Sequence, residues 1–158
     1  MDVKCQCTTV AFKTPTSEPL DVYFCHCSEC RKQSASAFGT SAIFPAEGLF
    51  PLSDDLREKL QVWTRPTKTG GQMDCYFCRN CGSRVFHRAR KNDGTLKPTI
   101  SIKGGMIVGL KIRNPKHIWT ESAVMTIPEG EDAWPQSPPE TQAQGGSVLT
   151  ADRGSQVE

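Results

Sequence analysis

The stretch Cys25-His26-Cys27-Ser28-Glu29-Cys30 places three cysteines within six residues, and these cysteines limit how the chain can fold. The other five cysteines lie in two tight clusters, Cys5 with Cys7 and then Cys75, Cys78 and Cys81. Cysteines one or two positions apart rarely form a disulfide with each other, because the bridge needs a particular Cβ separation and a dihedral angle near a right angle. A tetrahedral zinc ion accepts such close pairs readily. The spacing therefore predicts that the chain folds around zinc.

A disulfide framework is the alternative interpretation, and the even number of cysteines, 8, is compatible with it. Residues 1–8 are polar and lack the apolar segment of a secretory signal. No apolar run approaches the roughly 18 residues that a membrane-spanning helix needs. We therefore expect a cytoplasmic protein in a reducing compartment, whose cysteines bind metal rather than each other.

The composition indicates one domain with a modest core. The chain has 158 residues, 37% of them hydrophobic, with 11 prolines and 13 glycines. Metal crosslinks would supplement the limited apolar area. The 19 basic and 17 acidic residues leave a net charge of only +2, so the sequence predicts no nucleic-acid partner.

The pattern of apolar residues predicts a mostly β fold. Strands are expected over residues 3–12, 20–25, 61–64, 72–77, 84–88, 99–103 and 117–126. Side chains at i and i+2 share one face of a strand, so Cys5 and Cys7 can reach one ion, as can Cys25 and Cys27.

Two further segments stand apart from this strand pattern. Ser53, followed by Asp54 and Asp55, predicts the cap of a short helix over residues 56–60. From about Pro135 the sequence consists mainly of polar residues, glycine and proline. We predict a domain over residues 1–134 and a disordered polar tail over residues 135–158.

Spacing alone allows two ways of grouping the cysteines. A zinc-ribbon arrangement would join Cys27 and Cys30 to Cys78 and Cys81 in one four-thiolate site. The other arrangement forms a closed four-cysteine site from Cys5, Cys7, Cys78 and Cys81, and leaves Cys25, Cys27 and Cys30 as three ligands with an open fourth position. Only the second arrangement leaves a coordination position on a metal ion at which a substrate could react.

Four motifs in order carry a resemblance to a known family. They are C-x-C at 5–7, C-H-C-x-x-C with R-K at 25–32, F-C-x-x-C-G at 77–82 and H-I-W-T at 117–120. In these motifs the chain, from about residue 5 to residue 134, resembles the glutathione-dependent formaldehyde-activating enzymes, a family that includes centromere protein V. The resemblance implies a mostly β fold, a single β-sheet domain stapled by zinc.

The resemblance also selects the second grouping of the cysteines. It implies a structural zinc held by Cys5, Cys7, Cys78 and Cys81, and a catalytic zinc held by Cys25, Cys27 and Cys30. Four positions depart from the family pattern: Thr8 and Ala35 replace glycines, Val108 replaces an acid, and Met125 replaces an aromatic residue. The metal ligands are intact, but the pocket around them differs from the family pattern. The substrate named for the family is therefore not carried over to this chain.

A zinc ion with three thiolates has a net charge of minus one, which weakens its Lewis acidity and makes peptide hydrolysis a poor prediction. Thiol chemistry suits the site better. The glutathione thiol could take the fourth position as a thiolate and add to, or leave from, an electrophilic carbon. A zinc deaminase is a weaker alternative, because its H-x-E motif with a separate P-C-x-x-C motif is absent.

The other candidate site residues each have a structural and a functional interpretation. His26 lies between two predicted ligands and suits a structural hydrogen bond or proton transfer. Arg31 and Lys32 would bind a glutathione carboxylate or neutralise the thiolates. His117 and Trp119 are candidates for a pocket wall, as the resemblance implies, and Cys75 is either a buried apolar residue or a spare thiol.

Two functions follow as hypotheses. The first is a zinc-dependent carbon-sulfur lyase, or the reverse addition, that acts on a glutathione or other thiol adduct at Cys25, Cys27 and Cys30, assisted by His26. The alternative is a non-catalytic zinc module that binds a protein partner, although the sequence has no basic arm of the kind that binds polymers.

Overall fold

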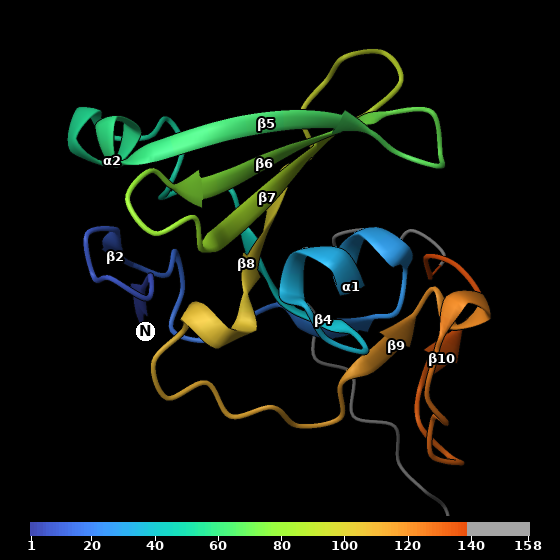
Figure 1. Ribbon diagram of the computed structural model, residues 1–158. Helices are drawn as coiled ribbons and strands as arrows, with labels where there is room; N and C mark the ends of the chain where they lie inside the picture. Colours follow the sequence, from blue (N-terminus) through green and yellow to red (C-terminus); the bar gives the residue numbers. More distant parts are fainter. Residues whose placement is uncertain (139–158) are drawn as a thin grey trace, which may run out of the picture.

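The computed structural model describes residues 1–138, which form a mostly β domain (Figure 1). A two-stranded antiparallel sheet comes first, with β1 (Asp2–Lys4) and β2 (Ala11–Lys13). The main sheet has eight strands within the described range: β3 (Asp21–Cys25), β4 (Gly39–Pro45), β5 (Leu60–Pro66), β6 (Gln72–Cys78), β7 (Arg84–Arg90), β8 (Thr99–Lys103), β9 (Lys116–Ile118) and β10 (Ala133–Trp134). The helices are α1 (Ser28–Ser34) and α2 (Asp54–Lys59), with single 3-10 turns at η1 (Gly104–Met106) and η2 (Thr120–Ser122).

The strands of the main sheet follow the order β10-β9-β3-β4-β8-β7-β6-β5. All neighbours from β3 to β5 in this order are antiparallel, whereas β9 runs parallel to both β3 and β10. Figure 1 shows β5 and β10 at opposite ends of the molecule, with α1 in front of β4. The centre of the sheet therefore comes from β3, β4, β8 and β7.

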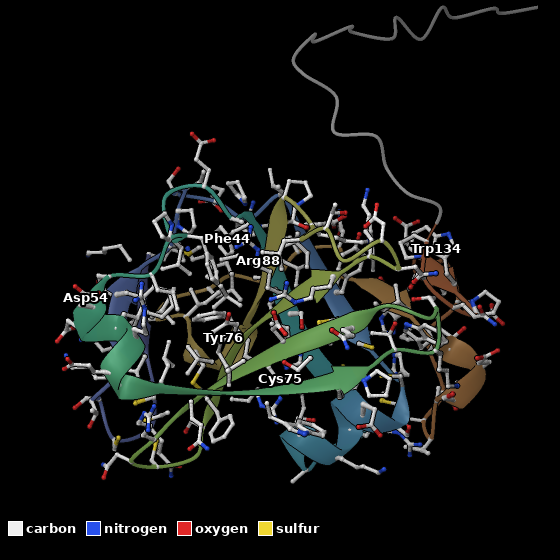
Figure 2. All side chains as sticks on the ribbon, turned by 90° about the horizontal axis from the view of Figure 1, so that it is seen from above. Phe44, Asp54, Cys75, Tyr76, Arg88 and Trp134 are labelled. Atoms are coloured by element: carbon white, nitrogen blue, oxygen red, sulfur yellow. The ribbon has the colours of Figure 1, made fainter. Side chains whose placement is uncertain are left out.

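The two faces of this central sheet differ in chemistry. Ala42, Ile102 and Phe86 occupy one row across β4, β8 and β7, and all three are fully buried in the apolar core. Ser41 and Lys103 form the adjacent row, whose side chains point to the opposite face. The core face is covered by the N-terminal hairpin and the segment around Phe50, where the Arg88 guanidinium lies 4.3 Å from the ring centre of Phe50. Figure 2 shows Phe44, Tyr76 and Arg88 in this part of the structure.

The predicted strand over residues 3–12 is wrong, because this segment is a hairpin. Hydrogen bonds from Cys5 N to Val10 O and from Thr8 N to Cys5 O, both 3.0 Å, close the turn between β1 and β2. Thr8 has a positive φ of 63°, which no strand accommodates. Cys5 and Cys7 therefore lie in a turn and not on a strand face.

The middle cysteines also depart from the expected strand. β3 ends at Cys25, and Cys27 is the N-cap of α1, a helix that the sequence analysis treated as a tight turn. Strand β4 was not predicted. The expected strand over residues 117–126 contains only the short β9 and then η2, because Trp119 adopts a positive φ of 59°.

The short capped helix is confirmed. Ser53 is the N-cap of α2, and its hydroxyl accepts a hydrogen bond from Leu56 N at 3.3 Å. The strands predicted over 20–25, 61–64, 72–77, 84–88 and 99–103 correspond to β3, β5, β6, β7 and β8. Among the described residues, no helix is long and apolar enough to span a membrane.

The predicted tail over residues 135–158 falls largely outside the described residues. Its first residues contact the domain, since the carbonyl groups of Pro135 and Gln136 accept hydrogen bonds from the backbone of Glu121 and Trp119. Residues 139–158 lie beyond the described range.

Candidate metal centres

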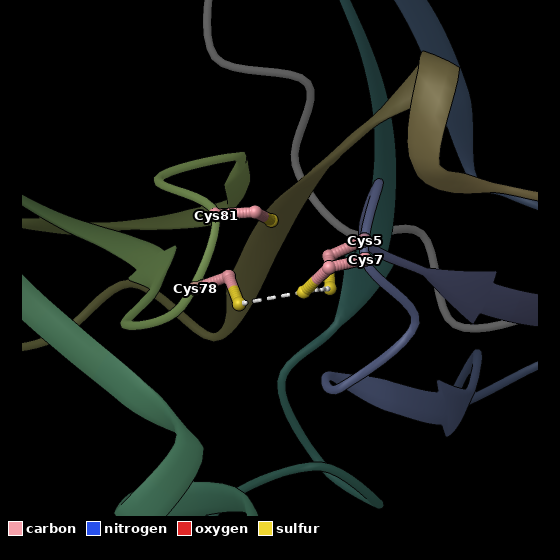
Figure 3. A group of neighbouring side chains, drawn as sticks. All are labelled: Cys5, Cys7, Cys78 and Cys81. Carbon is pink, nitrogen blue, oxygen red and sulfur yellow. Dashed lines mark hydrogen bonds between the residues drawn. The ribbon is translucent and has the colours of Figure 1, made fainter.

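Four cysteines, two from the N-terminal hairpin and two from the middle of the chain, meet beside the apolar core. Cys5 and Cys7 come from the hairpin turn, whereas Cys78 ends β6 and Cys81 follows it in the turn before β7 (Figure 3). The sulfur of Cys7 lies 3.5 Å from that of Cys5 and 3.7 Å from that of Cys78, and all four sulfurs lie within 4.8 Å of one another. Zinc-sulfur bonds of about 2.3 Å in a tetrahedron place sulfurs roughly 3.8 Å apart, so this donor set fits Zn²⁺.

The local backbone prepares this group for a cation. Val10 N donates to the sulfur of Cys5 at 3.2 Å. Hydrogen bonds from Thr9 and Asn80 lower the pKa of Cys7 to about 5, whereas burial raises the pKa of Cys5 to about 11. The thiols thus do not ionise together on their own, and a divalent cation would stabilise all four as thiolates.

The second group consists of Cys25, Cys27 and Cys30, which the end of β3 and the first turn of α1 bring together. The sulfurs of Cys25 and Cys27 are 3.5 Å apart, and all three lie within 4.8 Å of one another. Cys30 N also points toward the sulfur of Cys27 at 3.4 Å. Three thiol ligands at these distances suit a zinc ion that keeps one coordination position for another ligand.

Ionisation is unevenly distributed in this second group. Hydrogen bonds from Cys25 and Cys30 lower the pKa of Cys27 to about 2. Sharing a hydrogen bond with Cys27 raises the pKa of Cys25, since two adjacent thiolates repel each other. A bound cation would remove that conflict.

A cavity of about 730 Å³ opens onto the three-cysteine group. Its volume lies in the range of small-molecule sites. Six basic side chains and two acidic ones line it: Arg65, Lys68, Arg90, Lys91, Lys97 and Lys103, against Glu29 and Asp93. The cavity therefore suits an anionic ligand with a sulfur-bearing end.

The floor of the cavity is the polar face of the central sheet. Ser41, Ser101 and Lys103 line it from β4 and β8, although Lys103 is only 8% exposed. The Lys103 ammonium donates to the Ser41 hydroxyl at 3.0 Å. Sequence reasoning did not select these residues. The alternation of polar and apolar residues over Thr99–Lys103 was the available signal, because it places Ser101 and Lys103 on one face.

His87 lines the same cavity from β7 and was also not identified as functional. Arg84 Nη1 lies 3.4 Å from His87 Nε2, and a guanidinium can only donate, so Nε2 is the acceptor. Burial, with the positive charges of Lys103, Arg84 and Arg65, holds the pKa of His87 well below its usual value. His87 is therefore neutral.

His26 is fully buried and does not line the cavity. Its Nε2 lies 2.9 Å from Nδ1 of His117, and the two rings stack with their centres 5.2 Å apart. This contact fixes the backbone between Cys25 and Cys27. Burial lowers the pKa of His26, which favours the neutral form of its ring in this hydrogen bond.

The remaining candidates lie in different places. Trp119 lines the cavity, and the Lys68 ammonium lies 5.2 Å from its ring centre. Arg31 and Lys32 are on α1 and do not line the cavity, and Lys32 forms an exposed ion pair with Glu29 at 3.1 Å. The structure thus places Trp119, but neither α1 cation, at the pocket wall.

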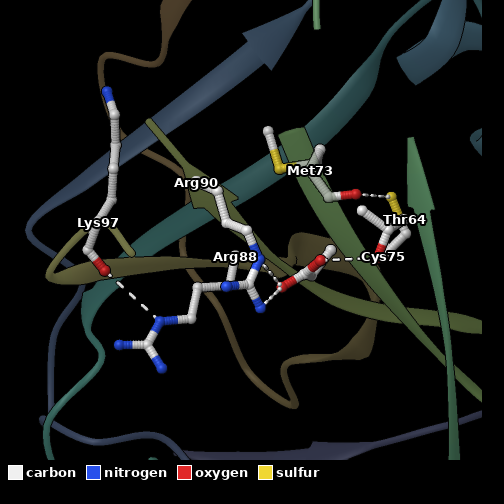
Figure 4. Close-up of polar contacts among 7 residues, drawn as sticks. Thr64, Met73, Cys75, Arg88, Arg90 and Lys97 are labelled. Atoms are coloured by element: carbon white, nitrogen blue, oxygen red, sulfur yellow. Dashed lines mark hydrogen bonds and ion pairs between the residues drawn. The ribbon is translucent and has the colours of Figure 1, made fainter. Parts of the chain in front are cut away.

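Cys75 belongs to neither cysteine group. It is fully buried, and its thiol donates to Met73 O at 3.5 Å (Figure 4). The preceding residue, Asp74, accepts hydrogen bonds from Thr64 at 2.7 Å and from Arg90, which also approaches it at 2.9 Å. These contacts tie β5, β6 and β7 together along one side of the cavity.

Comparison with known proteins agrees with this arrangement. No curated protein matches the chain. The family model of the glutathione-dependent formaldehyde-activating enzyme matches residues 1–122, which include both cysteine groups and most of the cavity lining. The chain therefore belongs to the glutathione-dependent formaldehyde-activating enzyme family.

Proposed function

We propose that the protein is a zinc-dependent enzyme that breaks or forms the carbon-sulfur bond of a glutathione adduct or another thiol adduct. The observation that carries the proposal is the three-cysteine group at a cavity whose charged lining residues are mostly basic. Cys25, Cys27 and Cys30 would hold one zinc ion, and Cys5, Cys7, Cys78 and Cys81 the other. Zinc bound to three cysteines would keep the sulfur of the thiol ionised at neutral pH.

The remaining parts of the site bind and orient the substrate. Glutathione carries two carboxylates, and the basic residues of the cavity would attract them. Trp119 supplies an aromatic wall, and the buried pair of His26 and His117 holds the ligand-bearing backbone in place. The burial of Cys25 and Cys30 limits the access of water to the sulfurs.

Native mass spectrometry tests this proposal directly. The protein should carry two zinc ions, and it should bind one glutathione when glutathione is added. Cys30→Ser should lose the bound glutathione and the turnover of the hemithioacetal formed by glutathione and formaldehyde. Cys75→Ala removes a thiol outside both groups and should behave like the wild type.

Two results would contradict the proposal. Wild-type protein with two zinc ions that neither binds glutathione nor turns over any thiol adduct would favour the non-catalytic zinc module. Equal activity of Cys30→Ser and wild type would remove the three-cysteine group from the chemistry.

A further inference from the structure

Lys103 is a buried cation without a carboxylate partner. Its side chain is on the polar face of the sheet, and no ion pair joins it to an acid within residues 1–138. Removing an ammonium group from water costs several kcal/mol unless other charges or hydrogen bonds compensate. Burial lowers the pKa of Lys103, and the hydroxyl of Ser41 and the electrostatic attraction of Cys30 and Cys25 offset only part of this cost.

The position of Lys103 follows from the sheet register. Lys103 on β8 pairs with Ser41 on β4, and Ser41 pairs with Tyr23 on β3. In the same register Cys25 pairs with Gly39, two residues along from Ser41. Lys103 and Ser41 therefore lie on the cavity floor, two residues along the strands from the end that carries Cys25.

The pair has unused hydrogen-bond donors. An ammonium has three N–H bonds, and Ser41 accepts only one of them. Because Ser41 acts as the acceptor, its own hydroxyl hydrogen remains free to donate. Both side chains line the cavity, so these donors can converge on a ligand atom held beside the cysteines.

We propose that Lys103 and Ser41 bind the oxygen atom on the substrate carbon that is bonded to sulfur, and so make the site specific for hemithioacetals and related carbonyl adducts. This inference rests on the proposed function. In the addition direction, the thiolate sulfur forms a bond to the carbonyl carbon, and the carbon-oxygen π pair moves onto oxygen. That oxygen takes a proton from solvent water, and the lyase direction reverses each step.

Donors fixed in position stabilise such an oxygen more in the transition state than in the ground state, because its negative charge develops as the carbon-sulfur bond forms. A thioether has no oxygen on that carbon and gains nothing from the pair. The Lys103–Ser41 pair would thus distinguish carbonyl adducts from simple alkylated thiols.

The test uses two stable glutathione derivatives of similar shape. S-acetylglutathione has an oxygen on the carbon bonded to sulfur, and S-ethylglutathione does not. Calorimetry on the zinc-loaded protein should show tighter binding of the acetyl compound by about 10-fold, as expected for hydrogen bonds to a charged donor. Lys103→Met should abolish this preference for the acetyl compound over the ethyl compound, and Ser41→Ala should reduce it.

A folding defect is separable from this effect. Methionine has a length similar to that of lysine and carries no charge that must be removed from water, so Lys103→Met should keep the wild-type melting temperature and both zinc ions. Its turnover of the hemithioacetal of glutathione and formaldehyde should fall by about 100-fold, as when one oxyanion donor is removed.

Each contrary outcome has a distinct meaning. If Lys103→Met loses zinc, or loses affinity for both derivatives equally, Lys103 is only a counterion for the thiolates and the inference is wrong. An unchanged preference for the acetyl compound also overturns it, although the proposed function stands if the wild type binds glutathione. A wild type that binds neither derivative and turns over no thiol adduct rejects the proposed function, and the inference with it.

Discussion

At the scale of single residues, two departures from the family pattern acquire a physical meaning. Thr8 and Ala35 replace glycines that the family resemblance leads us to expect, and both adopt positive φ, 63° and 48°. This left-handed region is costly for residues with a Cβ and readily accessible to glycine. Both residues therefore carry backbone strain next to a cysteine group.

We predict that Thr8→Gly stabilises the protein by about 1 kcal/mol, since relief of the left-handed strain exceeds the added flexibility of the unfolded chain. Chemical denaturation at constant zinc measures the change. Gly94→Ala is a reciprocal control, because Gly94 has a φ of 84° and no atom within 4 Å of the added Cβ. It should destabilise the protein by a similar amount, and equal stability of Thr8→Gly and wild type would contradict the strain.

His87 gives a prediction about pH. Its folded pKa lies well below the ordinary value of 6.5, owing first to burial and then to Lys103, Arg84 and Arg65. The unfolded chain therefore binds a proton that the folded chain does not. The stability from His87 is present above about pH 6.5 and is lost as pH falls below it, by about 1 kcal/mol per pH unit.

His87→Gln should remove this dependence. Between pH 7.5 and 5.5 the variant should lose less stability than the wild type, as measured by urea denaturation. The cysteine ligands are the same in both proteins, so the difference isolates His87. Parallel pH curves would show that His87 does not resist protonation in the fold.

At the scale of elements, the contact between α1 and β4 sets the position of Cys30. A Cβ added at Gly39 would lie 3.1 Å from Cys30 Cβ and 3.2 Å from Cys30 O. The first turn of α1 can pack closely against β4 because Gly39, the β4 residue beside Cys30, has no side chain. A metal ligand is thus positioned by a strand that contains none of the ligands.

We predict that Gly39→Ala displaces Cys30 by a few tenths of an ångström and weakens zinc binding at the three-cysteine group about 10-fold, an effect of the size seen when groups that support metal ligands are changed. Competition with a chromogenic chelator measures the affinity. Gly105→Ala is the matched control, because nothing lies within 4 Å of the added Cβ. Wild-type affinity in both variants would show that the α1–β4 contact does not position Cys30.

At the scale of the whole molecule, the two cysteine groups hold different parts of the fold. The four-cysteine group joins the N-terminal hairpin to the turn after β6 and touches the core, where Cys5 and Cys78 are buried. The three-cysteine group joins only the end of β3 to α1 and faces the cavity. Loss of metal from the two groups should therefore have unequal consequences.

We predict that Cys81→Ser lowers the melting temperature sharply, whereas Cys27→Ser spares the fold and loses one zinc ion. A closed site contributes its binding free energy to folding, and its loss removes a long-range crosslink. Differential scanning calorimetry with parallel zinc analysis measures both effects. Equal destabilisation by the two variants would make the three-cysteine group structural as well.

The C-terminal boundary of the domain is a second question at this scale. We propose that the folded domain extends beyond residue 134, since Ser137 and Pro138 line the cavity. A chain truncated after residue 138 retains both residues and is the reference for the melting temperature and for glutathione binding. Truncation after residue 134 should weaken binding, because it removes the carbonyl partners of Trp119 and Glu121. Identical melting temperatures and glutathione binding of the two truncated chains would support the predicted domain boundary at residue 134.

Local features of the sequence predicted much of this structure. Three of these features extend over only a few residues: the Ser53 cap, the alternation in β8 and the spacing of the cysteines. They can therefore be recognised in the sequence without knowledge of the fold. Helix α1 was missed because its seven residues, of which only Cys30 is buried, carry little helical periodicity. The hairpin was missed because the positive φ at Thr8 has no signature in a threonine.

By itself, the sequence indicated a mostly β domain with clustered thiols that could hold metal ions, and its motifs indicated the family. Its spacing left open which cysteines share an ion, because Cys7 and Cys78 are 71 residues apart and only the tertiary structure brings their sulfurs to 3.7 Å. The tertiary structure also decided that Lys103, Ser41 and His87 surround one cavity. The register of β4, β7 and β8 places them there, and register depends on long-range pairing that no local pattern encodes.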